Sequence, residues 1–130
     1  MSDSTKRITG IVVDDEPDIV DVFSEMLEDR GIEVIGKGGN GKEAIDLYFA
    51  NNPDIVFVDM MMPDGSGFYA IKKIRAKDSK AVIIAVTADV TSLTEEKLKK
   101  LKVNGIVYKP IDMDNLMEIV KISQISKISK

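Results

Sequence analysis

Three aspartates stand at the ends of two short apolar segments and are the residues best placed to do chemistry. Asp14 and Asp15 follow the β-branched run 11–13, and Asp59 follows the run 55–58. If these runs are neighbouring parallel strands, their carboxyl ends bring three carboxylates together. Two carboxylates about 4 Å apart repel by roughly 4 kcal/mol at an effective dielectric constant near 20, so such a cluster needs a cation. Carboxylate ligands of this kind favour Mg²⁺.

Acidic residues also gather at helix N-termini, where the helix dipole favours negative charge. That interpretation fits Asp14 to Asp18. It does not fit Asp59, because Met60-Met61-Met62-Pro63 follows it and not a helical pattern. We therefore predict a metal site.

Two further strand ends offer a hydroxyl and an ammonium group. Thr87 follows the run 81–86, and Lys109 follows the run 106–108. Either residue alone would be an ordinary surface residue. Their joint placement opposite a carboxylate cluster predicts a clamp for a phosphoryl group in transfer. The nucleophile inside such a clamp is a carboxylate, and formation of an aspartyl phosphate is an established covalent step.

Composition excludes most other chemistry. The chain of 130 residues has no histidine and no cysteine, so imidazole catalysis, thiolate chemistry and disulfides are ruled out. The net charge of −4 argues against a general nucleic-acid binder, and no apolar run is long enough to span a bilayer.

Charge is unevenly spread along the chain: residues 14–33 carry nine acids and one base, and residues 97–102 carry four lysines and no acid. We interpret such runs either as solvated helix faces or as docking surfaces.

The elements that must position these residues alternate between two patterns. Continuous apolar runs without alternation are typical of strands buried on both faces, and a weaker run at 32–35 fits an edge strand. Between them, apolar residues recur at helical spacing, as in Ile19, Val22, Phe23, Met26 and Leu27. Pro17 suits the start of that helix, and Gly31 suits its end. Asn104-Gly105 is expected to end the fourth helix. This order predicts an α/β fold, a flavodoxin-like (βα)5 doubly wound five-stranded parallel sheet with strand order 2-1-3-4-5.

A single domain is expected over residues 7–121. Residues 1–6 form a polar tail. Residues 122–130 form a helix extension or tail, within an Ile-x-x repeat that begins at Ile119 and could also bind a partner.

Four motifs in this order resemble one known family. They are Val-Val-Asp14-Asp15-Glu16-Pro17, then Asp59-x-x-Met62-Pro63-x-x-x-Gly67, then Thr87-Ala88, and then Lys109-Pro110. The set is similar to the receiver domain of two-component response regulators, and in particular to single-domain receivers of the chemotaxis-regulator kind. The resemblance covers residues 7–121.

The resemblance implies a role for each matched residue. Asp59 is the expected phosphoacceptor. Asp15, Asp59 and the backbone carbonyl of Met61 are the expected Mg²⁺ ligands, and Asp14 is expected to act through a metal-bound water. Lys109 is expected to pair with Asp59 and then with the phosphoryl group, which the Thr87 hydroxyl and the Ala88 N–H would also bind. The Lys109-Pro110 bond is expected to be cis.

The implied pathway is a phosphorelay. A histidine kinase or phosphotransfer protein would donate the phosphoryl group from a phosphohistidine, in the cytoplasm. The face formed by the fourth helix, fifth strand and fifth helix would then signal to a protein target. Helix 17–30, with its acidic surface, and the loop after Lys109 are expected to meet the donor. No direct nucleic-acid or membrane partner is expected, and the sequence leaves the oligomeric state open.

One position departs from the family pattern, and two other functions compete. Family members often carry an aromatic switch residue three positions before the lysine, where this chain has Ile106; Tyr108 is expected to point away from Lys109.

The run Gly36-Lys37-Gly38-Gly39-Asn40-Gly41 matches a dinucleotide-binding fingerprint, but it follows the second strand and is more simply interpreted as a flexible loop. A Mg²⁺-dependent phosphatase with an aspartyl-phosphate intermediate would use similar residues, but no inserted specificity element is visible.

Overall fold

The computed structural model describes residues 7–128, and side chains as far as residue 124. The predicted tail 1–6 and the last two residues of the predicted extension lie outside this part of the chain. The strands are β1 (Ile8–Val13), β2 (Ile32–Gly38), β3 (Ile55–Asp59), β4 (Ile83–Thr87) and β5 (Gly105–Tyr108). The helices are α1 (Pro17–Asp29), α2 (Gly41–Asn51), α3 (Ser66–Lys77), α4 (Ser92–Lys100) and α5 (Met113–Ile128). Of these helices, none has the length and apolar character that crossing a membrane requires.

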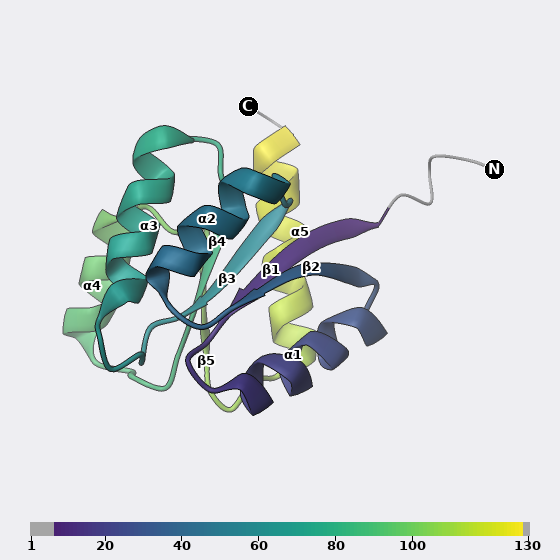
Figure 1. Cartoon of the computed structure of the whole chain (residues 1–130), viewed down its shortest axis with the longest axis horizontal. Helices are drawn as coiled ribbons and strands as arrows, with labels where there is room; N and C mark the ends of the chain where they lie inside the picture. The colour runs from purple at the N-terminus through teal and green to yellow at the C-terminus, as the bar shows by residue number, and fades with distance from the viewer. Residues whose placement is uncertain (1–6, 129–130) are drawn as a thin grey trace.

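The five strands form one parallel sheet in the order β2-β1-β3-β4-β5, which confirms the predicted topology (Figure 1). β1 and β3 are therefore neighbours, with Val13 opposite Val58. Their carboxyl ends lie at the point where the strand order reverses, which is where open α/β sheets bind ligands.

Helices cover both faces of the sheet (Figure 1). Each face has its own apolar layer. One layer is made by α2, α3 and α4 and includes Ile71 and Leu98, both fully buried. The other is made by α1 and α5 and includes Leu27 and Leu116, also fully buried. β3 is buried along its whole length, as expected for a central strand with helices on both sides.

Helix ends follow from local sequence. Pro17 begins α1, and Gly31, at φ 90°, follows its end. The Asp112 side chain accepts hydrogen bonds from the backbone N–H groups of Asp114 and Asn115 and so caps the start of α5.

Two sequence-based expectations are wrong in detail. α4 ends at Lys100, followed by Lys102 at positive φ, so Asn104-Gly105 does not close it. Gly105 instead begins β5, and the Asn104 side chain accepts hydrogen bonds from Ile83 and Arg75. The glycine-rich segment is not simply a flexible loop either: β2 extends to Gly38, with Gly36 opposite Ile11 and Gly38 opposite Val13.

The C-terminal segment continues α5 without a break as far as Ile128. Ile119 packs against the layer of α1 and α5, the Ser123 hydroxyl donates to the Ile119 carbonyl, and Ile122 is exposed. The boundary at residue 121 stays a prediction.

Candidate functional site: an acidic cluster at the ends of β1 and β3

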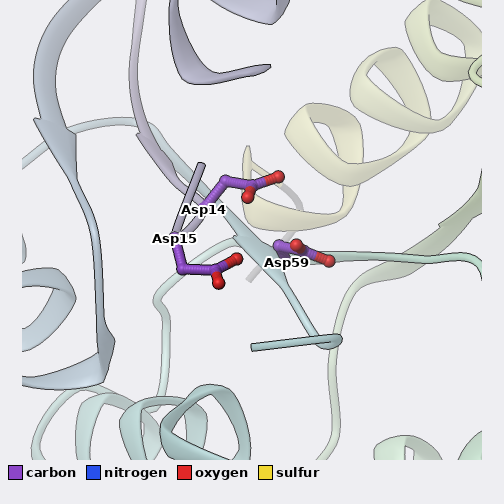
Figure 2. A group of neighbouring side chains, drawn as sticks. All are labelled: Asp14, Asp15 and Asp59. Carbon is purple, nitrogen blue, oxygen red and sulfur yellow. The ribbon is translucent and has the colours of Figure 1, made fainter. Parts of the chain in front are cut away.

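Three carboxylates meet where β1 and β3 end (Figure 2). Asp14, Asp15 and Asp59 each offer an oxygen, and these oxygens all lie within 4.8 Å of one another. Asp14 and Asp59 are each only 5% exposed, whereas Asp15 is exposed. Two buried carboxylates and one open to solvent make a shallow anionic site, and its oxygen-only donor set fits a Mg²⁺ ion that keeps several waters.

Backbone amides hold the two buried carboxylates in place. Asp14 Oδ1 accepts a hydrogen bond from the Glu16 N–H (3.0 Å), and Asp59 Oδ1 accepts one from the Met61 N–H (3.1 Å). Each carboxylate therefore bonds the residue two positions later in its own loop, which fixes its orientation before any ligand arrives.

Lys109 lies between the remaining oxygens of the same two residues. Its Nζ is 3.4 Å from Asp14 Oδ2 and 3.6 Å from Asp59 Oδ2. The sequence predicted the pair with Asp59, and the structure adds the contact with Asp14.

The electrostatic balance leaves the site short of positive charge. Burial raises the pKa of the Asp59 carboxyl above its usual value, and the charge of Asp14 raises it further. The Met61 N–H and the charge of Lys109 oppose this shift and do not cancel it. The pKa of this carboxyl group stays raised even beside a lysine, so a second cation would stabilise its ionised form.

Thr87 and Ala88 lie at the end of β4, next to the acidic cluster in the sheet because Asp59 pairs with Val86. Thr87 is fully buried, and its hydroxyl oxygen accepts a hydrogen bond from the Asp89 N–H (2.9 Å). Its carbonyl accepts one from the Lys109 N–H (2.9 Å), which ties the ends of β4 and β5 together. Ala88 is exposed.

Three predicted positions remain, namely Met61, Pro110 and Ile106. Met61 is exposed and lies in the loop that follows Asp59. The Lys109-Pro110 peptide bond is cis, as expected. Ile106 is half-buried and packs against the apolar layer of α2, α3 and α4.

Sequence reasoning missed a hydrogen-bond network around Asp89. Its carboxylate accepts hydrogen bonds from the Thr91 N–H (2.9 Å) and from the Thr94 hydroxyl (2.6 Å), and these bonds lower its pKa. Since its own N–H bonds the Thr87 hydroxyl, Asp89 links Thr87 to the first turn of α4. A run of Asp and Thr before a helix was the available signal.

An apolar groove of about 220 Å³ lies beside the acidic cluster. It runs between α1 and the segment after β5, with Ile19, Val22 and Met26 on one side and Pro110 and Ile111 on the other. Lys109 borders both the groove and the acidic cluster.

Comparison with known families identifies this arrangement. A family model described as the response regulator receiver domain matches residues 11–121. The chain belongs to that family. Receiver domains are signalling switches of two-component systems, and they bind Mg²⁺ at an acidic pocket, with which the three aspartates are consistent.

Relatives of this receiver include short and long proteins. It is 30% identical over 125 residues to the chemotaxis protein CheY of Thermotoga maritima, and the match covers 96% of this chain and 98% of that protein. It is 29% identical to the probable C4-dicarboxylate response regulator DctR of Priestia megaterium, covering 96% of this chain and 59% of that regulator. The chain thus spans little more than half of some regulators that it matches.

Solved structures agree with the fold. The structure of the response regulator TrrA from Thermotoga maritima, in complex with Mg²⁺ and BeF, is 35% identical, has a TM-score of 0.79, and covers 89% of this chain and 98% of that one. A two-component response regulator of the LuxR family from Aurantimonas is 29% identical, with a TM-score of 0.84, and covers 92% of this chain and 86% of that one.

Proposed function

We propose that this receiver accepts a phosphoryl group on Asp59 from a phosphohistidine of a histidine kinase or phosphotransfer protein, in a Mg²⁺-dependent reaction in the cytoplasm. One observation carries the proposal: Asp59 is buried in the carboxylate cluster, contacts Lys109, and lies beside the end of β4 that carries Thr87. Asp14 also contacts Lys109, but it follows β1, which is not a neighbour of β4 in the sheet.

The chain's own groups fit the metal. Asp15, Asp59 and the backbone carbonyl of Met61 would hold it, and Asp14 would act through a bound water. When bound, Mg²⁺ neutralises the charge of the phosphoryl oxygens. Asp14 and Asp59 reach the site already oriented by their hydrogen bonds to Glu16 and Met61.

Transfer itself exchanges one bond for another. A carboxylate oxygen of Asp59 forms the new O–P bond while the P–N bond of the phosphohistidine breaks, and the electron pair of that bond returns to the imidazole. Lys109 then moves its contact from the carboxylate to a phosphoryl oxygen. The Thr87 hydroxyl and the Ala88 N–H would bind the other oxygens, which requires Thr87 to leave its hydrogen bond with Asp89.

The donor would dock on α1 and on the loop after Lys109. The apolar groove borders Lys109 there, and Val22 on its rim is 57% exposed. Exposed acidic residues lie elsewhere on α1, among them Asp18 and also Asp21, which pairs with Lys37 (3.1 Å). A donor with an apolar contact surface and basic residues around it matches this combination.

The target would dock on the face formed by α4, β5 and α5. Leu93 on α4 is 67% exposed, and three of the last four residues of α4 are lysines. Once the target is identified, reversing the charge of Lys97, Lys99 and Lys100 should abolish its binding. Reversal of Lys72, Lys73 and Lys77 on α3 is the matched control, and equal binding of both variants would refute this placement.

Intact mass spectrometry tests the central proposal. The receiver is incubated with Mg²⁺ and a small acyl-phosphate donor, and it should gain one phosphoryl group. Asp59→Asn and a chelator should each prevent the gain. Asp54→Asn, a matched change at a carboxylate that bonds Thr9, should not. No gain in the folded wild-type protein, or equal gain in Asp59→Asn, would refute it. Turnover of a small phosphomonoester would indicate a phosphatase instead.

A further inference from the structure

A tight turn joins the two halves of the acidic cluster. This glycine turn, residues 38–41, connects β2 to α2. At one end, the Gly38 carbonyl accepts a hydrogen bond from the Asp14 N–H (3.1 Å). At the other end, the Gly41 N–H donates to the Ser66 hydroxyl (2.7 Å), and Ser66 begins α3 in the segment after Asp59. The glycine turn thus contacts both chain segments that carry the carboxylates.

Gly41 is in closer contact with α3 than a hydrogen bond alone requires. A Cβ atom at Gly41 would overlap the carbonyl oxygen of Ser66, and it would lie 2.7 Å from the Ser66 Cβ and 2.8 Å from the Ser66 carbonyl carbon. Two of these three atoms are backbone and cannot turn away. Any side chain at Gly41 would therefore push the first turn of α3 away from α2.

The first turn of α3 lies directly against Asp59. A Cβ atom at Gly67 would lie 3.0 Å from the carbonyl oxygen of Asp59 and 3.2 Å from the Met60 Cε. Gly67 itself is buried. Two close contacts in series therefore connect Gly41 to the phosphoacceptor: Gly41 against Ser66, and Gly67 against Asp59.

We infer that Gly41 is a positioning residue for the Mg²⁺ site. Its missing side chain lets α2 hold the start of α3, and so the segment from Asp59 to Met61, where the carboxylate and carbonyl ligands converge. This inference rests on the proposed function, because it assumes that these groups bind Mg²⁺. It also gives the last glycine of the fingerprint-like run a role other than nucleotide binding.

The test compares Mg²⁺ affinity in two variants of the same turn. Gly41→Ala adds the overlapping Cβ. Gly39→Ala adds a Cβ whose nearest neighbour is the flexible end of Glu43 at 3.6 Å, at a residue whose φ is outside the left-handed region. Alanine favours helices more than glycine does, so helix propensity alone would not weaken Gly41→Ala.

Titration with Mg²⁺, followed by NMR of the backbone amides, gives each dissociation constant. We expect Gly41→Ala to bind Mg²⁺ about tenfold more weakly than wild type, as for other changes behind metal ligands, and Gly39→Ala to bind like wild type. Urea unfolding in chelator measures the stability of each variant separately.

The outcomes are distinct. Lower stability of Gly41→Ala with unchanged Mg²⁺ affinity would show a packing role only and overturn the inference. If Gly41→Ala does not fold, Ser66→Ala replaces it: this change removes the hydrogen bond to Gly41 and adds no atoms, and unchanged affinity would overturn the inference equally. Absence of Mg²⁺ binding in wild type would refute the proposed function and this inference together, whereas equal affinities in all variants refute the inference alone.

Discussion

Replacing Asp59, the proposed phosphoacceptor, by asparagine should make the metal-free receiver more stable. The side chain of Asp59 lies within 4.8 Å of the Asp14 and Asp15 carboxylates and 3.6 Å from the Lys109 ammonium. At an effective dielectric constant of 20, repulsion from Asp14 is at least about 3.5 kcal/mol and attraction to Lys109 about 4.6 kcal/mol. Lys109 is partly exposed and shared with Asp14, so solvent and sharing reduce its contribution.

The two contributions nearly cancel, which leaves the burial of the carboxylate and the weaker repulsion from exposed Asp15. Burying a charged group costs several kcal/mol before hydrogen bonds offset it. Asparagine keeps the oxygen that accepts the Met61 N–H and has the same shape. We therefore expect Asp59→Asn to raise the free energy of unfolding by about 1–3 kcal/mol.

Urea unfolding in chelator, followed by circular dichroism, measures this difference. Asp54→Asn is the matched control, because Asp54 accepts hydrogen bonds from the Thr9 N–H (2.8 Å) and hydroxyl (3.2 Å) and has no comparable charge conflict. It should not be stabilised. Mg²⁺ at ten times its dissociation constant should stabilise wild type by about 1.4 kcal/mol and Asp59→Asn by much less. An Asp59→Asn protein less stable than wild type in chelator would refute the electrostatic reasoning.

Acidification should reduce the stability difference between wild type and Asp59→Asn. The pKa of Asp59 is raised in the folded protein above the ordinary value of 3.8, so the folded state binds this proton more tightly than the unfolded state. The ionised carboxylate therefore destabilises the fold above its folded pKa. That penalty is lost as the pH falls through the folded pKa toward 3.8. A stability difference that stayed constant or grew over this range would contradict the assigned shift.

Two further changes test other parts of the structure. The Tyr48 hydroxyl donates to Asp78 (2.7 Å), and burial together with Asp78 raises the pKa of Tyr48. Tyr48→Phe should therefore lower the free energy of unfolding by about 1–2 kcal/mol. Tyr69→Phe, at an exposed side chain, should change it little, and equal effects of the two changes in urea unfolding would contradict this prediction. Asp89→Ala removes the carboxylate that accepts a hydrogen bond from Thr94. The backbone amide hydrogens in the first turn of α4 should then exchange with solvent faster, while the affinity for Mg²⁺ stays unchanged. Unaltered amide exchange would show that Asp89 does not hold α4.

The sequence predicted the parts of the site that depend on strand order. Buried runs alternating with amphipathic segments predict a doubly wound sheet, and in that sheet Asp14, Asp59 and Lys109 must end close together. It did not predict the contact of Lys109 with Asp14, because the choice between two oxygens 3.4 and 3.6 Å away depends on backbone register and side-chain rotamer. Such differences of a few tenths of an ångström leave no mark in composition or periodicity.

The glycine-rich segment shows why the remaining errors arose. The glycines between residues 36 and 41 suggest a flexible loop, because glycine lacks a side chain and adopts many backbone angles. In the fold, Gly36 and Gly38 extend an edge strand, and a Cβ at either position would come within 3.3 Å of the Leu47 side chain on α2. Glycine is there for close packing, and a single sequence does not distinguish a glycine needed for space from one needed for flexibility.

Position 106 has no aromatic side chain, and the connection from Thr87 to the protein surface instead runs through Asp89. Ile106 is half-buried in the layer of α2, α3 and α4 and has no hydroxyl to hydrogen-bond. Thr87, by contrast, is bonded to the Asp89 N–H, and the Asp89 carboxylate is bonded to Thr94 on α4. If Thr87 turns toward a phosphoryl group on Asp59, the Asp89 amide loses its acceptor and the loop before α4 must rearrange. The packing of Ile106 would then follow the movement of α4, so that α4 carries the signal and the side chain at 106 adapts to it.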